Sequence, residues 1–268
     1  MKRVHTFEFE DAAWFPSWLR VSMTRVLVVF ARAVGVDKTL SELVSRVLTE
    51  QRLDRIVDLG SGAGGVMPDV LERVRRDGEL ADTRLLLTDL YPHDDAIAAL
   101  DGSASGRVHY ERSPVDATDL ASAPTGLKTM VNCFHHMRPE QARSILRSAQ
   151  ESRQPLLMYE MGDNKMPFAL WGLALPLSLP MVFITCLVFT PFVRPLTVRQ
   201  LLFTYVIPLI PIFYAWDGQA SMPRIYTLED LDELLHGLDS EDYVWEKGAA
   251  KTPRGAKMGI YLIGLPAS

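Results

Sequence analysis

Residues 55–65 read RIVDLGSGAGG, a short apolar run that ends in a cluster of glycines. The short apolar run over residues 55–60 predicts a strand buried on both faces of a sheet. The glycines predict a tight turn, because a residue without a Cβ lets the backbone approach a ligand closely. Residues 68–77 predict a helix, with Pro68 near its first turn and Gly78 just past its end. The free N–H groups at the start of that helix would face the same ligand.

The alternation of strand and helix patterns continues along the next hundred residues. Further strands are predicted over residues 85–89, 107–115, 128–134 and 155–160, and helices over residues 94–100 and 139–152. Strands that alternate with helices pair in parallel through right-handed crossovers. The last two strands, over residues 243–247 and 257–265, could form a hairpin. We therefore predict an α/β fold, a Rossmann-like doubly wound sheet that is mostly parallel and ends in a C-terminal antiparallel strand.

Length, charge and cysteine content narrow the class of protein. The chain has 268 residues and is 48% hydrophobic, enough for one large domain or for one domain with an insertion. Its net charge of −5 argues against a nucleic-acid partner, since phosphate binding needs clustered lysines and arginines. Two cysteines favour a reducing compartment. Residues 1–16 start basic, but acidic residues replace the apolar core of a signal peptide, so we expect a cytoplasmic protein.

Changes of pattern divide the chain into four segments. We expect an N-terminal helical segment over residues 1–50, a ligand-binding α/β core over residues 51–164, an apolar, mostly helical insertion over residues 165–222, and a closing helix and strands over residues 223–268. Apolar residues recur at helical spacing on both sides of Gly35. The closing helix begins with a capping-box-like Thr227 and Asp230.

The charge beside the glycines indicates what the turn binds. Asp58 stands two residues before Gly60, and both G-x-G-x-G and G-x-G-x-x-G can be written through Gly64 or Gly65. A carboxylate at this position would repel a pyrophosphate, but it suits a ligand that carries an ammonium group. S-adenosylmethionine carries both an ammonium and a sulfonium group.

The order of motifs over roughly residues 53–162 resembles the class I S-adenosylmethionine-dependent methyltransferase family. The matching stretches are 57–64 (VDLGSGAG), 88–90 (TDL), 115–117 (VDA) and 132–137 (NCFHHM). The resemblance implies S-adenosylmethionine as cofactor, with the acid of the second motif on the ribose hydroxyls and that of the third on the adenine amino group. The cofactor-binding residues it implies are Asp58, Gly60, Ser61, Gly62, Gly64, Asp89, Leu90, Asp116, Ala117, Asn132 and Phe134.

Each acid also has a purely structural interpretation. Asp58 could cap the glycine turn, Asp89 could serve as a turn or N-cap residue, and Asp116 could cap its own loop beside Thr118. If the resemblance holds, Asp58, Asp89 and Asp116 converge with the turn around a single positively charged nucleoside.

Candidate catalytic residues follow from the chemistry of methyl transfer, which needs a base only if the acceptor loses a proton. His135, His136 and Glu160 lie at the ends of predicted strands, and Asp217 lies where the insertion returns. The histidines could equally be structural. We predict no metal site, because no cysteine or carboxylate stands at a ligand spacing near the histidine pair. Arg20, in the helical segment before the sheet, is a candidate for the methionine carboxylate, or else a surface arginine.

The insertion follows the fifth strand, whose carboxyl end faces the ligand crevice in such sheets. Residues 166–193 contain no charge, and residues 200–216 are again uncharged after Arg194 and Arg199. The segment could be a lid over an apolar pocket, a helix in a membrane interface, or a transmembrane hairpin that prolines interrupt. We therefore expect a small, lipophilic acceptor, methylated on oxygen, nitrogen or sulfur, and allow peripheral contact with the inner face of a membrane.

Two alternatives remain open at this point. The glycine spacing also fits a nicotinamide-dependent oxidoreductase, although Asp58 and the Asp116 motif argue against it. The chain could also be a membrane-associated, methyltransferase-like binding protein without turnover, because one fold hosts many functions.

Overall fold

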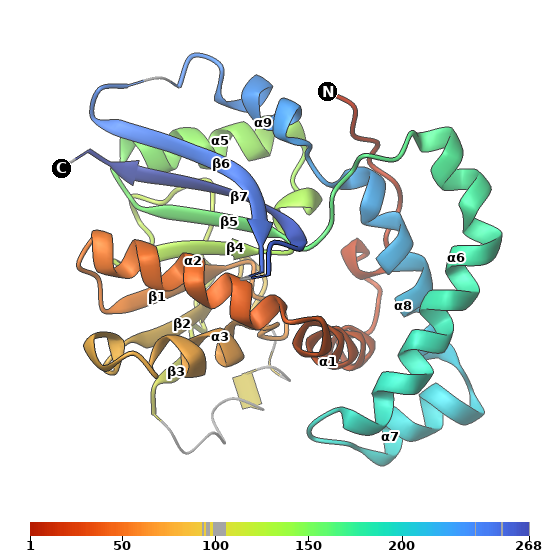
Figure 1. Ribbon diagram of the computed structural model, residues 1–268. Coiled ribbons are helices and arrows are strands. Elements are labelled where there is room, and N and C mark those ends of the chain that lie inside the picture. The colour runs from red at the N-terminus through yellow and green to blue at the C-terminus, as the bar shows by residue number, and fades with distance from the viewer. Residues whose placement is uncertain (93, 95–96, 99–105, 239, 253, 268) are drawn as a thin grey trace.

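The computed structural model describes residues 1–268 except 93, 95–96, 99–105, 239, 253 and 268. The helix expected over residues 94–100 lies for the most part outside the described residues. Figure 1 shows a sheet with helices on both faces, and a separate group of helices, α1, α6, α7 and α8, beside it.

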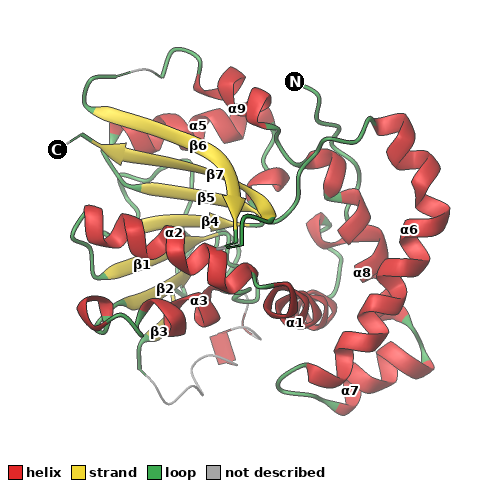
Figure 2. Ribbon diagram, viewed as in Figure 1, coloured by secondary structure: helices red, strands yellow, loops and turns green. Residues whose placement is uncertain are grey.

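Within the described residues, seven strands form one sheet in the order β3-β2-β1-β4-β5-β7-β6 (Figure 2). The strands are β1 (Arg55–Leu59), β2 (Arg84–Thr88), β3 (Val108–Tyr110), β4 (Leu127–Val131), β5 (Leu156–Glu160), β6 (Tyr243–Lys251) and β7 (Lys257–Pro266). Strands β1 to β5 pair in parallel, and β7 runs antiparallel to both β5 and β6. The doubly wound, mostly parallel sheet with an antiparallel C-terminal hairpin is thus confirmed.

The strand order reverses between β1 and its two neighbours, β2 and β4. In open α/β sheets a ligand crevice lies outside the carboxyl ends of the strands at such a reversal. The glycine turn follows β1 directly, so the sequence places it at this point of the sheet.

The helices are α1 (Ser17–Val34), α2 (Val36–Glu50), α3 (Met67–Val74), α5 (Pro139–Glu151), α6 (Phe168–Phe189), α7 (Val198–Leu201), α8 (Leu209–Ala220) and α9 (Leu228–Leu235). Helices α2 and α3 cover one face of the sheet, and α5 and α9 cover the other (Figure 1). Strand periodicity explains the two layers, because Ile56 packs into the first core and Val57 into the second.

Several boundaries follow local backbone chemistry. Gly35, with φ of 85°, separates α1 from α2, and Thr227 and Asp230 form the expected capping box of α9. The third strand is shorter than predicted, ending at Tyr110. The fourth ends at Val131, because Asn132 takes a positive φ of 53° and the chain then turns as a short 3-10 helix.

The predicted insertion is helical. Helix α6 continues through Pro176 and Pro180, although a proline inside a helix removes a backbone N–H donor and crowds the carbonyl of the preceding turn. A π-helical turn, η5 (Leu202–Val206), connects α7 to α8. A third core joins these elements to α1, and its members are Phe15, Leu19, Met23, Val26, Val29, Cys186, Val193, Ile210 and Tyr214.

Among the described residues, one helical stretch, Phe168–Phe192, is long and apolar enough to cross a membrane. Only 6% of its most apolar window is buried, so it is not a core helix. The segments Val198–Val206 and Leu209–Arg224 pass the same test only as a pair, bent by 78°.

Candidate active site

The glycine turn after β1 is built on left-handed backbone. Gly60, Gly62 and Gly64 have φ of 65°, 51° and 95°, values that side chains with a Cβ rarely adopt. A Cβ added at Gly62 or at Gly65 would meet no heavy atom within 4 Å. The turn therefore presents bare backbone to open space, as the approach of a ligand requires.

Asp58 lies beneath this turn. Its carboxylate accepts hydrogen bonds from the hydroxyls of Ser61 (2.6 Å) and Thr129 (2.7 Å). The side chain is buried, and burial raises the pKa of Asp58 to about 7 despite these hydroxyl donors. Asp58 thus caps the glycine turn through the hydroxyl of Ser61. Direct contact of Asp58 with the ammonium group of a cofactor stays a prediction.

Asp89 follows β2 and faces the turn. One carboxylate oxygen accepts from the backbone N–H of Gly62 (2.9 Å), and the other accepts from that of Tyr91 (2.9 Å). Its charge adds to the raised pKa of Asp58, so the two acids are close. Leu90 beside it is exposed. This half-buried acid, beside bare glycine backbone, has the placement that ribose hydroxyls would need.

The third predicted acid lies in a neighbouring loop. The carboxylate of Asp116 accepts from the backbone N–H (2.8 Å) and the hydroxyl (2.7 Å) of Thr118, as a loop cap does. Its loop is tied to the second motif, because the N–H of Val115 donates to the carbonyl of Asp89 (2.9 Å). Ala117 packs against the second core. A contact of Asp116 with adenine stays a prediction.

The fourth motif connects the ends of β4 and β5. The side-chain oxygen of Asn132 accepts from the N–H of Met161 (2.8 Å). Phe134 is fully buried and packs on Tyr226, with ring centroids 5.4 Å apart. Phe134 therefore contacts a cofactor only if its side chain moves.

His135 and Glu160 form a buried pair. Glu160 Oε2 lies 2.9 Å from His135 Nδ1, and Glu160 Oε1 accepts from the backbone N–H of His135 (3.0 Å). An ionised carboxylate only accepts, so in the neutral form of His135 the proton lies on Nδ1 and the lone pair on Nε2. Among the described residues His135 Nε2 has no hydrogen-bond partner. This is the geometry of an oriented imidazole base.

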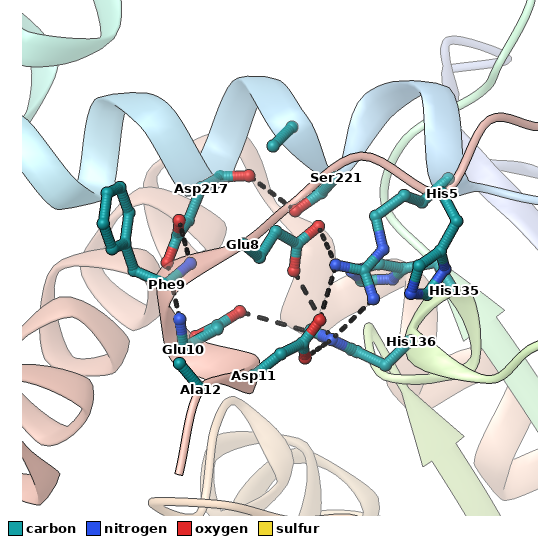
Figure 3. Close-up of polar contacts among 12 residues, drawn as sticks. His5, Glu8, Phe9, Glu10, Asp11, Ala12, His135, His136, Asp217 and Ser221 are labelled. Atoms are coloured by element: carbon teal, nitrogen blue, oxygen red, sulfur yellow. Dashed lines mark hydrogen bonds and ion pairs between the residues drawn. The ribbon is translucent and has the colours of Figure 1, made fainter. Parts of the chain in front are cut away.

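The N-terminal segment brings acids to the second histidine. His136 Nδ1 lies 2.7 Å from Asp11 Oδ1 and 3.4 Å from Glu8 Oε2 (Figure 3). Glu8 is completely buried, and burial raises its pKa to about 8 although His136 and Arg224 oppose the shift. Glu140 is the acid nearest to the histidine pair in the sequence, but the fold brings Glu8 and Asp11 to the pair from more than a hundred residues away.

Arg224, which was also missed by sequence reasoning, carries the positive charge that faces the acids of the N-terminal segment. Its Nη1 lies 3.1 Å from Glu8 Oε1 and 2.7 Å from Asp11 Oδ2, and its side chain has no exposed surface. Burial pushes the pKa of Asp11 upward, but the hydrogen bond and charge of His136 and the charge of Arg224 hold it below the ordinary value. An arginine within an otherwise apolar stretch was the available signal, because a buried guanidinium needs paired acids.

Two further predicted residues contact the N-terminal segment. Asp217, on α8, accepts from the backbone N–H groups of Phe9 (2.8 Å) and Glu10 (3.1 Å) (Figure 3). Burial raises the pKa of Asp217 to about 7. The guanidinium of Arg20 donates to the backbone carbonyls of Glu10 (2.9 Å) and Ala12. Both residues thus fix the N-terminal segment, and contact of Arg20 with a methionine carboxylate stays a prediction.

Glu8, His135 and His136 also meet the distance criterion for a cation site, with ligand atoms within 4.8 Å of one another. The guanidinium of Arg224 lies against the same Glu8 carboxylate, which lowers the attraction for a cation. We therefore assign no metal to this cluster.

No family model and no curated protein sequence matches the chain. The structure of the plantazolicin methyltransferase BpumL in complex with SAH matches it with a TM-score of 0.50 at 11% identity, over 94% of this chain and 98% of BpumL. A second BpumL complex, with SAH and a monoazolic desmethylplantazolicin analogue, gives a TM-score of 0.51 over the same shares. At this identity the likeness concerns the fold.

An O-methyltransferase family protein from Burkholderia thailandensis is 16% identical, with a TM-score of 0.47. The match covers 87% of this chain but only 57% of that protein, so the chain spans little more than half of its length. The strand order and the BpumL matches together define the class: the chain has the class I methyltransferase fold.

Proposed function

We propose that the protein is an S-adenosylmethionine-dependent methyltransferase that methylates a small, apolar acceptor. The observation that carries the proposal is the pairing of Asp89 with Gly62 at the reversal of strand order. Bare backbone with open space above it and an acid at the end of β2 fit a ribose with its attached chain. BpumL, which shares the fold, was crystallised with SAH.

Bound S-adenosylmethionine would supply a methyl group on a sulfonium, which is already a good leaving group. The chain must then align the acceptor and keep water out. His135 is the base in this proposal, because Glu160 holds its ring and its Nε2 carries a free lone pair. An acceptor hydroxyl or thiol would lose its proton to that nitrogen as its oxygen or sulfur attacks the methyl group, and an amine acceptor would lose one from the methylated ammonium it forms.

His136 and Asp217 act as positioning residues in this proposal. Asp217 fastens the N-terminal segment through two backbone N–H groups, and His136 pairs with Asp11 of that segment. The segment lies over the histidine pair, since Glu8 is completely buried there. Entry of an acceptor therefore requires this segment to move.

The apolar helices beside the sheet support an apolar acceptor. The third core, formed by α1, α6 and α8, adjoins the N-terminal segment through Phe9, which packs on Phe213 of α8 with ring centroids 4.7 Å apart. An acceptor that enters here meets aromatic and aliphatic side chains. Acceptors of this kind gather in lipid, so we place the protein in the cytoplasm, in peripheral contact with the inner face of a membrane.

Release of S-adenosylhomocysteine tests the proposed activity. The purified chain is incubated with S-adenosylmethionine and either the organic-phase or the aqueous-phase extract of cells. We expect product with the organic phase and little with the aqueous phase. Product with the aqueous phase alone would refute the apolar acceptor, and no product with either would favour a binding protein without turnover. NADH oxidation in the same extracts would favour the oxidoreductase, for which the comparisons provide no support.

A further inference from the structure

The outward face of α6 is apolar along its whole length. Large side chains recur on it at intervals of three and four residues: Leu170, Leu173, Leu177, Met181, Ile184 and Val188. Leu173 and Leu177 are 78% and 80% exposed. Single exposed apolar residues are ordinary, but a continuous row of this length marks a surface that contacts an apolar phase.

The apolar surface extends past the end of α6. Val198 on α7 is 82% exposed, and Val206 at the end of η5 is 71% exposed. Figure 1 shows α6 and α7 at the outer edge of the molecule, on the side away from the sheet. We call the exposed row on α6 the α6 face.

The charged residues around the α6 face indicate which apolar phase this surface contacts. Residues 165–216 contain three charged residues, all basic, in a protein whose net charge is −5. Lys165 and Arg194 are exposed and stand just before and just after the helix. The absence of charge from a helix of about 33 Å, with cations beyond both ends, fits an apolar phase bounded by anionic headgroups. This length would also cross the roughly 30 Å core of a bilayer, so the packing of the helix decides how it lies.

Packing of the opposite flank shows how α6 can enter a membrane. The indole N–H of Trp171 donates to the carbonyl of Gln219 on α8 (3.0 Å), and Phe189 packs on Phe30 of α1, with ring centroids 5.9 Å apart. Both ends of α6 are thus held against the rest of the protein. Helix α1 in turn is tied to the sheet layer, because its Arg32 pairs with Asp69 of α3. If α6 spanned the membrane, the charged residues of α1 and α3 would be drawn into lipid. If only the outward face of α6 is immersed, these charged residues stay in water.

We propose that the protein docks on anionic membranes through the α6 face, with α6 lying in the plane of one leaflet. The inference names the partner for the peripheral contact suggested above. It is independent of methyl transfer, since vesicle binding is measured without cofactor or acceptor.

Flotation of the full chain with vesicles tests the docking. The vesicles contain phosphatidylcholine alone or with roughly 30% phosphatidylglycerol, whose charge attracts basic side chains. We expect the protein to float with both, more with the anionic vesicles and less as salt is added. Protein that stays at the bottom of the gradient with both would overturn the proposal.

Variants locate the contact. The double variant Leu173→Glu, Leu177→Glu should lower the partition coefficient by at least about tenfold, because two leucine side chains no longer leave water. Both side chains point to solvent, so the melting temperature should not change. Val244→Glu, at a residue 58% exposed on β6, is the matched control and should float like the unaltered protein. Flotation of the double variant at the control level would refute the α6 face.

Depth measurement distinguishes in-plane docking from spanning. A fluorophore attached at Leu177→Cys should be quenched more by lipids brominated near the headgroups than by lipids brominated near the chain ends. Stronger quenching at the chain ends would show a spanning helix and contradict the proposal. A dimer in solution that Leu173→Glu, Leu177→Glu dissociates, with no flotation of the unaltered protein, would mean that the α6 face binds a second copy instead.

Discussion

His135 and Glu160 are joined by two hydrogen bonds across the ends of neighbouring strands, one from the backbone N–H (3.0 Å) and one at Nδ1 (2.9 Å). The double contact fixes both the position and the tautomer of the ring, because the carboxylate can only accept. Gly259 of β7 permits this arrangement, since a Cβ there would lie 2.0 Å from the carbonyl oxygen of Glu160. The backbone of the sheet therefore helps to fix the position of the pair.

The proposed base predicts the effect of changing this pair. His135→Asn should lower S-adenosylhomocysteine release by about 10²–10⁴-fold, the usual contribution of a general base. Glu160→Gln should lower it less, since the ring remains but its tautomer is no longer fixed. His109→Asn, at an exposed histidine on β3, is the control and should keep full activity. Unchanged turnover in His135→Asn with the cofactor still bound would rule out this base.

Asp217 predicts a pH dependence of stability. Its pKa is about 7 in the folded protein and near 4 when unfolded, so between these values the folded state binds the extra proton. The free energy of unfolding should therefore fall as pH rises from 5 to 7, by up to about 1.4 kcal/mol per pH unit for one proton. Asp217→Asn should flatten this fall, as measured by urea denaturation at each pH. A curve parallel to that of the unaltered protein would contradict the assignment.

Arg224 predicts a large loss of stability on truncation. Arg224→Met removes a fully buried guanidinium from the ionised Asp11 and from Glu8, which should cost about 3–5 kcal/mol. Adding Glu8→Gln should recover part of this loss, because the two side chains are coupled. Arg84→Met, which breaks the exposed pair with Asp54, should cost less than about 1 kcal/mol. Equal losses for the two arginine variants would show that the buried cluster is not coupled.

The left-handed backbone of the glycine turn predicts that alanine destabilises the protein there more than at a glycine elsewhere in the chain. Gly60→Ala should destabilise the protein by about 1–2 kcal/mol, because alanine disfavours a φ of 65°. The new Cβ would also lie 3.3 Å from Cys133 Sγ. Gly78→Ala is the control: no positive φ holds there and nothing lies within 4 Å of the new Cβ. Thermal denaturation of both variants checks this, and equal melting temperatures would count against the strained turn.

Local patterns were sufficient to predict the fold of the sheet. Apolar runs, glycines and caps act within a few residues, so β1, the glycine turn and the capping box at Thr227 could be predicted correctly. The length of β3 could not, because it depends on how far β3 pairs with the neighbouring β2, and this pairing ends at Tyr110. Continuity of α6 through Pro176 and Pro180 could not be predicted either, because proline has the lowest helix propensity.

The candidate site was predictable only where it follows the strands. His135 lies four residues after the end of β4 and Glu160 is the last residue of β5, and parallel strands bring their carboxyl ends to one edge. Glu8 and Arg224 could not be paired from the sequence, since their contact depends on how the N-terminal segment crosses α8. The contacts of Asp116 could be anticipated from the sequence, because a local cap of its own loop was one of the interpretations left open for this residue.

Isothermal titration of S-adenosylmethionine tests the central claim most directly. We expect saturable binding to the unaltered chain, and binding at least about tenfold weaker to Asp89→Ala, which removes a charged acceptor of hydrogen bonds. Asp82→Ala, an exposed acid at the opposite end of β2, should bind like the unaltered chain. NADH should give no binding heat. Equal affinity of Asp89→Ala and the unaltered chain, or saturable binding of NADH in place of S-adenosylmethionine, would contradict the account.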